Sequence, residues 1–153
     1  MSFRATAAQA TPVSYELEWG VVRGLCWGDP NNVTVIATHG WLDNCHSFLP
    51  LAEHWNSDHG GLIALDWAGH GHSDHRPRGT HYHFIDYAYD LWQILTHHIN
   101  SPVTLLGHSM GGFVSNVVAS ICPEKVDKLI LVEAFGLLVS DEMNAREQLA
   151  KGF

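Results

Sequence analysis

The sequence predicts an α/β domain in which a mostly parallel, doubly wound sheet carries helices on both faces. Short apolar runs rich in β-branched residues recur along the chain, and such runs are typical of strands that are buried on both faces. They occupy residues 33–38, 62–65, 103–106 and 129–132. Segments with helical spacing lie between several of these runs. Strands that alternate with helices form βαβ units and therefore a parallel sheet.

Composition limits the classes of function. A chain of 153 residues with 46% hydrophobic and 16% charged residues suits one packed domain. A net charge of −8 without a basic stripe argues against a nucleic-acid partner. No apolar run has the roughly 18 residues of a membrane span, and residues 1–12 do not resemble a signal peptide. Cys26, Cys45 and Cys122 fit neither a disulfide framework nor a zinc pattern, which favours reduced thiols and a cytoplasmic location.

The N-terminal part predicts an antiparallel edge of the sheet. We expect residues 1–12 to form a flexible leader. Residues 13–19 alternate between apolar and polar, the pattern of a half-buried strand. Gly20 allows a turn into a second strand at 21–27, so these residues predict a hairpin. The cluster at 28–32 then predicts a turn before the first buried strand.

Three helices are expected within the core and one beyond it. Apolar residues trace one face of a helix over 84–99, and a second helix covers 110–121, closed by Pro123. The pattern over 45–55 predicts a third, weaker helix. We assign residues 13–139 to the core and 140–153 to the start of a cap or lid helix.

The most specific motif is a glycine-flanked serine. Gly107, Ser109 and Gly111 form G-x-S-x-G directly after a buried strand and at the start of a helix. The small flanking residues permit a turn tight enough to raise the serine hydroxyl out of the sheet. The helix N-terminus behind it favours developing negative charge. The alternative is a glycine-rich turn in which Ser109 only caps the helix.

Two further motifs follow strands. Strand 33–38 leads into His39 and Gly40, where a glycine lets the backbone expose an N–H group. An oxyanion hole needs two such donors, and we assign the N–H groups of Trp41 and Met110. We favour a supporting role for His39, through hydrogen bonds to the loop, over a catalytic one. Residues 66–73 predict a structural turn tied down by the side chains at its two ends.

Together, the segments His-Gly-Trp at 39–41, Asp-x-x-Gly-x-Gly-x-Ser at 66–73 and Gly-His-Ser-Met-Gly-Gly at 107–112 resemble the α/β-hydrolase superfamily. The longer block 39–44, followed by Ser47 and Phe48, resembles the branch called serine hydrolase-like proteins. The resemblance covers about residues 13–139.

The resemblance implies transfer of an acyl group from a small-molecule substrate to water, without a cofactor. Ser109 would be the nucleophile, and Gly107, His108 and Gly111 would support it. The family order is nucleophile, acid, histidine, but no histidine follows Ser109 here. We therefore expect a fragment of a longer enzyme, truncated after about the sixth strand. Glu133 is a candidate for the acid, and it could instead anchor the cap entrance or face solvent.

Two other classes of function remain open. A non-catalytic module would keep a ligand pocket in a degenerate hydrolase fold. A metal site would use His81 and His83 on a histidine-rich segment, although a solvated loop explains these residues more simply. The choice among ester, thioester and C–C substrates, and the oligomeric state, cannot be read from these residues.

Overall fold

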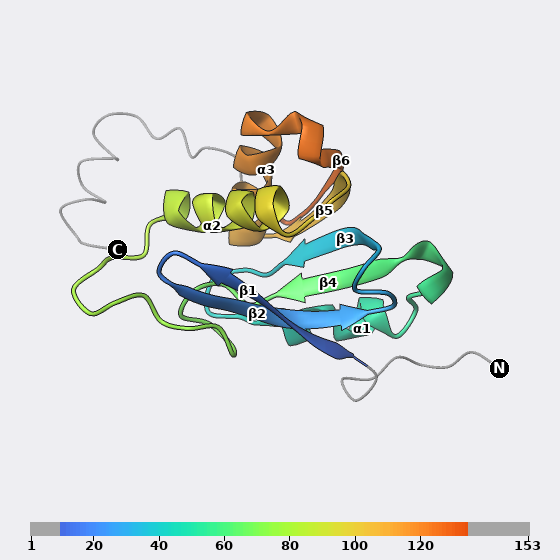
Figure 1. The fold of residues 1–153 in the computed structure, drawn as a ribbon, viewed down its shortest axis with the longest axis horizontal. Helices are drawn as coiled ribbons and strands as arrows, with labels where there is room; N and C mark the ends of the chain where they lie inside the picture. Colours follow the sequence, from blue (N-terminus) through green and yellow to red (C-terminus); the bar gives the residue numbers. More distant parts are fainter. Residues whose placement is uncertain (1–9, 135–153) are drawn as a thin grey trace.

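A computed structural model describes residues 10–134 and contains one six-stranded sheet in the order β1-β2-β4-β3-β5-β6 (Figure 1). The neighbouring pairs β4–β3, β3–β5 and β5–β6 are parallel, whereas β2 runs antiparallel to both β1 and β4. This confirms the predicted fold class, with its antiparallel N-terminal hairpin. The strands are β1 (Thr11–Leu17), β2 (Gly20–Trp27), β3 (Val33–Thr38), β4 (Gly61–Leu65), β5 (Val103–His108) and β6 (Val126–Val132).

Helices cover both faces of the sheet. In Figure 1, α2 (Phe84–His97) and α3 (Met110–Ile121) lie together on one side, and α1 (Leu49–Ala52) lies on the other. Short 3-10 turns occupy Cys45–Phe48, Ser57–His59 and Pro123–Lys125. The crossing connections therefore pass over both faces, as a doubly wound sheet requires.

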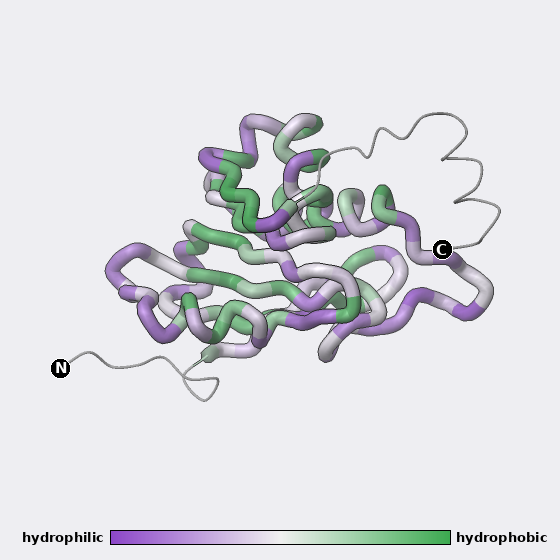
Figure 2. Tube along the Cα trace, turned by 180° about the vertical axis from the view of Figure 1, so that it is seen from behind, coloured by the Kyte–Doolittle hydropathy of each residue, from purple (hydrophilic) through white to green (hydrophobic). Residues whose placement is uncertain are grey.

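Each face has its own apolar core. Under α2 and α3, the largest buried side chains include Trp67, Tyr87, Ile36, Leu91 and Leu105. Trp27, Phe48 and Leu62 belong to the smaller core beneath α1. The tube in Figure 2 shows apolar colour along the strands, while polar colour gathers in the connecting loops. Strands buried in this way account for the continuous apolar runs in the sequence.

The predicted helix over residues 45–55 is wrong in extent. The segment folds as a 3-10 turn at Cys45–Phe48 followed by the four-residue α1. Pro50 lies in the first turn of α1, where its missing N–H is tolerated. Beyond α1 the chain turns again, and Asn56 caps a new 3-10 turn by accepting from the Asp58 N–H at 3.0 Å. Asparagine favours such turns because its side chain competes for backbone groups.

The start of strand β1 and several predictions on other parts of the chain can also be compared with the structure. Strand β1 begins at Thr11, inside the predicted leader, because Thr11 pairs with Cys26 across the hairpin. The predicted start of a cap or lid helix at 140–153 lies outside the described residues. All three cysteines are free and buried. Within residues 10–134, no helix is long and apolar enough to cross a bilayer.

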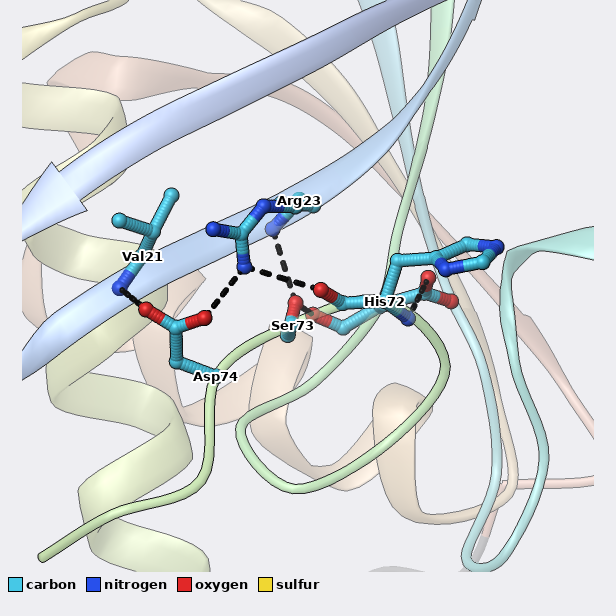
Figure 3. Close-up of polar contacts among 6 residues, drawn as sticks. Val21, Arg23, His72, Ser73 and Asp74 are labelled. Atoms are coloured by element: carbon cyan, nitrogen blue, oxygen red, sulfur yellow. Dashed lines mark hydrogen bonds and ion pairs between the residues drawn. The ribbon is translucent and has the colours of Figure 1, made fainter.

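The turn after β4 is fastened to β2 by a set of polar contacts (Figure 3). The Val21 N–H donates to Asp74 Oδ2 at 3.0 Å, and the Arg23 N–H donates to Ser73 Oγ at 2.8 Å. The Arg23 guanidinium bridges the His72 carbonyl, at 2.9 Å, and the Asp74 carboxylate. These contacts fix the position of the turn relative to β2.

A buried ion pair attaches α2 to the same region. Asp90, on α2, is fully buried and accepts from Trp19 Nε1 at 2.8 Å and from Arg76 Nη2 at 2.6 Å. The Arg76 guanidinium also lies over the Trp19 ring, 4.6 Å from its centroid. Burial raises the pKa of Asp90, and the two donors oppose that rise. Three segments distant in sequence are thus joined at one carboxylate.

Candidate active site

Ser109 occupies a strained turn between β5 and α3. Its φ of 51° and ψ of −117° lie in a region that residues with side chains rarely adopt. The Ser109 N–H donates to the Val132 carbonyl at 3.1 Å, and the Phe113 N–H donates to the Ser109 carbonyl at 3.1 Å. The turn is therefore held from β6 on one side and from α3 on the other. The residue itself remains half-buried rather than enclosed.

The flanking glycines are explained by close backbone contacts. A Cβ atom on Gly107 would lie 2.4 Å from the Gly112 Cα atom, and a Cβ atom on Gly111 would lie 2.2 Å from the Thr38 carbonyl oxygen. Both obstacles are backbone, so a side-chain rearrangement cannot relieve them. The Thr38 hydroxyl fixes the same junction by donating to the Gly111 carbonyl at 3.1 Å. These contacts seat α3 directly on the end of β3.

Replacing Gly111 by alanine is expected to lower the free energy of unfolding by about 1–3 kcal/mol, because the added methyl group must push α3 away from β3. This loss outweighs the gain in helix propensity of about 1 kcal/mol that alanine normally brings. Denaturant titration followed by tryptophan fluorescence measures the change. Asn116→Ala, on the exposed side of α3, is the matched control and should leave stability nearly unchanged. Equal stability of Gly111→Ala and the control would contradict the packing described here.

The loop after β3 lies directly against the serine. A Cβ atom on Gly40 would lie 3.2 Å from Ser109 Cβ and 3.3 Å from His108 Nδ1, so this position has little room for a side chain. Within residues 10–134, neither the Trp41 N–H nor the Met110 N–H donates a hydrogen bond to another group of the protein. The two N–H groups that the sequence suggests as oxyanion donors are thus unpaired within the described residues.

His39 is fully buried and both of its ring nitrogens are used. Its Nε2 accepts from the Trp67 N–H at 3.1 Å, which leaves the proton on Nδ1 to be donated to the Gly40 carbonyl at 2.7 Å. Burial lowers the pKa of His39, which favours this neutral form. The Gly40 carbonyl belongs to the same peptide group as the Trp41 N–H. The His39 ring therefore fixes the orientation of one of the two free donors.

Strained backbone is concentrated just after the carboxyl ends of three parallel strands. Among the described residues, the non-glycine positions with positive φ are Leu42 at 58°, Ser109 at 51° and Glu133 at 47°. They follow β3, β5 and β6, which are neighbours in the sheet. Strained backbone of this kind persists only where the surroundings impose it, and it is enriched at functional sites. The carboxyl edge of a parallel sheet is also where ligands bind in open α/β folds.

The turn over residues 66–73 supports the loop, as the sequence predicts. The buried Asp66 carboxylate accepts from the Cys45 N–H at 2.7 Å and from the His72 N–H at 2.9 Å. The Ser73 hydroxyl closes the turn by donating to the Asp66 carbonyl at 2.6 Å. Sequence reasoning missed His70, whose Nε2 accepts from the Leu42 N–H at 3.2 Å. A histidine inside a glycine-rich turn carries no periodic signal that would point to this contact.

Within residues 10–134, the remaining candidate residues form neither a triad with Ser109 nor a metal site. All twelve histidines of the sequence lie within residues 10–134, and none forms a hydrogen bond with Ser109 there. Glu133 is exposed directly after β6 and makes no hydrogen bond or ion pair inside the described range. The His81 and His83 rings lie 5.8 Å apart between centroids. Yet no third ligand joins them in the described part of the chain, which leaves the metal-site hypothesis without a ligand set.

Comparisons with known proteins show the family to which the chain belongs. The model of the α/β hydrolase fold family matches residues 33–153. A serine hydrolase-like protein of Danio rerio is 33% identical over 88% of this chain and 41% of its own length. A serine hydrolase-like protein of Homo sapiens is 33% identical over 94% of this chain and 70% of its own length.

A solved structure of a hypothetical protein from Pseudomonas aeruginosa superimposes with a TM-score of 0.79 at 36% identity. The superposition covers 91% of this chain and 49% of that protein. Apart from the human relative covered to 70%, the chain spans less than half the length of the serine hydrolase-like relatives of fish, fly, mouse and human that it matches. The matching motifs, the strand order and these relatives show that the chain belongs to the α/β-hydrolase fold family, in its serine hydrolase-like branch.

Proposed function

We propose that Ser109 is the nucleophile of a serine hydrolase that cleaves esters or related acyl substrates through an acyl-enzyme. One observation carries the proposal: a strained, half-buried serine faces the glycine of a neighbouring loop, with two unused main-chain donors beside it. A serine that only capped α3 would use its hydroxyl on the helix, but the Ser109 side chain makes no capping hydrogen bond.

The proposed reaction has two half-reactions. Ser109 Oγ attacks the carbonyl carbon of the substrate, and its proton passes to a histidine base. The N–H groups of Trp41 and Met110 stabilise the oxyanion, and the N-terminus of α3 adds a favourable dipole. The alcohol or thiol leaves with the proton. Water, deprotonated by the same histidine, then attacks the acyl-enzyme, releases the acid and restores the Ser109 hydroxyl.

A histidine base and a carboxylate acid complete the proposed site. We propose that the base comes from a part of the family fold that these 153 residues do not span, since none of the twelve histidines forms a hydrogen bond with Ser109 in the described part of the chain. Glu133 is our candidate for the acid. It follows β6, the neighbour of the nucleophile strand, and His108 pairs with Val132 one residue before it. A carboxylate at this edge could reach a histidine placed over Ser109.

The test is covalent labelling of the protein, expressed from its natural reading frame, with a fluorophosphonate. We expect one phosphonate per molecule on wild-type protein and none on Ser109→Ala, measured by intact mass. Ser120→Ala is the matched control, because Ser120 is an exposed serine of α3 whose hydroxyl bonds to the Asn116 carbonyl. It should label as wild type does. Equal labelling of wild type and Ser109→Ala would overturn the proposal and favour a non-catalytic ligand-binding module.

A further inference from the structure

His70 lies on the fixed turn after β4 and uses both of its ring nitrogens. Because the Leu42 N–H is a donor, His70 Nε2 must accept at 3.2 Å. The ring proton therefore resides on Nδ1 and is donated to the Ala68 carbonyl at 3.0 Å. This second bond orients the ring from within its own turn. Residues on either side of His70 are held by Asp66, Ser73 and the contacts to β2 (Figure 3).

Leu42 needs an external anchor. Its φ of 58° lies in the left-handed region, which costs a residue with a side chain about 1–3 kcal/mol. Its side chain is 80% exposed, so packing does not provide the compensation. The N–H bond to His70 is the contact that fixes this strained peptide. The carbonyl of the same peptide group belongs to Trp41, the residue whose N–H is a proposed oxyanion donor.

The His70 ring also packs within an aromatic group. Its centroid lies 5.6 Å from Trp41, 5.3 Å from His39 and 6.2 Å from Tyr87. His39 fixes the Gly40–Trp41 peptide through the Gly40 carbonyl, and His70 fixes the next peptide through the Leu42 N–H. Two histidines in contact therefore hold two successive peptides of the loop, one on each side of Trp41.

We propose that His70 is a positioning residue for the reaction of Ser109, keeping the Trp41 N–H aimed at the oxyanion by accepting from the Leu42 N–H. The inference rests on the proposed function, in which Trp41 supplies one of the two donors. It assigns His70 no contact with substrate. What it requires is a hydrogen-bond acceptor at the Nε2 position, not merely an aromatic ring.

Three variants separate the acceptor from the ring. His70→Phe keeps the ring packing and removes the acceptor. His70→Gln keeps an acceptor oxygen near the position of Nε2 and removes the ring. His72→Phe is the matched control, since His72 is an exposed histidine of the same turn whose contacts within the described residues are made by its backbone.

The first readout is independent of activity and uses NMR of the isotope-labelled chain. In wild type we expect His70 to be protonated on Nδ1, with the nitrogen shift of an acceptor at Nε2. The Leu42 amide signal should move upfield, and its exchange with solvent should accelerate, in His70→Phe but neither in His70→Gln nor in His72→Phe. Identical Leu42 signals in wild type and His70→Phe would overturn the inference, whatever the fate of the proposed function.

The second readout is hydrolysis of a p-nitrophenyl ester by protein from the natural reading frame. We expect His70→Phe to lower kcat by roughly 10- to 100-fold with little change in KM, because a misplaced donor weakens transition-state rather than ground-state binding. His70→Gln should recover most of the loss. A normal kcat for His70→Phe, or a kcat for His70→Gln as low as that of His70→Phe, would overturn the inference. Failure of the proposed function would instead appear as equal rates for wild type and Ser109→Ala.

Discussion

Alanine at position 109 is expected to lower kcat for ester hydrolysis by about 10⁶-fold while KM changes little. Removing the nucleophile eliminates the acyl-enzyme, and what remains is the residual catalysis from binding and from the oxyanion donors. Initial rates with a p-nitrophenyl ester, measured for protein from the natural reading frame, determine the ratio. Ser120→Ala, which removes an exposed hydroxyl from the same helix, should retain full activity.

The Ser109→Ala variant should also fold normally, which separates a catalytic from a structural loss. The Ser109 side chain caps no helix group, and the substitution removes a single half-buried oxygen atom. We therefore expect the free energy of unfolding to change by no more than about 0.5 kcal/mol. Retained activity in a folded Ser109→Ala protein would refute the assignment of the nucleophile.

The second large effect is on stability. Arg76→Met is expected to lower the free energy of unfolding by about 3–5 kcal/mol, because it leaves the Asp90 carboxylate buried without a counterion. The Arg76 and Asp90 side chains are only 12% and 1% exposed, so solvent cannot replace the lost charge. Chemical denaturation followed by circular dichroism gives the difference. Arg78→Met is the matched control on the exposed surface two residues away and should be nearly neutral.

The sign of the pH dependence provides an internal check on this pair. Burial already raises the pKa of Asp90, and removing the cation raises it further. At a pH between the ordinary pKa of an aspartate and the raised pKa of Asp90, the folded variant binds a proton that the unfolded chain releases. The free energy of unfolding of the variant therefore rises as the pH falls through this range. The double variant Arg76→Met/Asp90→Asn, which keeps an acceptor for Trp19 without a charge, should recover most of the loss. No recovery in the double variant would contradict an electrostatic origin.

Much of the fold could be predicted because burial leaves a direct trace in the sequence. Strand β3 (33–38) and helix α3 (110–121) were expected at the bounds that the structure shows. Continuous apolar runs and helical spacing specify such elements before any tertiary contact is known. The region 45–55 could not be predicted in the same way. Pro50 lies within the apolar pattern there, and Asn44 and Asn56 cap short turns on either side of it. The local sequence is therefore compatible both with one helix and with a series of short turns.

The backbone geometry around the candidate nucleophile could be predicted for an analogous reason. Ser109, Gly107 and Gly111 follow from local sterics, since a tight turn after a strand admits few residue types. The His70–Leu42 hydrogen bond joins residues 28 positions apart, and no local pattern encodes it.

The buried position of Asp90 is visible in the sequence, because a carboxylate stands on the buried face of α2 between Tyr87 and Ile94. Its partners Trp19 and Arg76 become evident only in three dimensions.

A crystal structure of the protein phosphonylated by a fluorophosphonate would show directly which groups bind the oxyanion at Ser109. We expect a covalent bond from phosphorus to Ser109 Oγ, with the phosphoryl oxygen about 2.7–3.1 Å from both the Trp41 and the Met110 nitrogen atoms. A phosphoryl oxygen turned to solvent, or bound by other donors, would contradict the central claim that these two N–H groups form the oxyanion hole of Ser109.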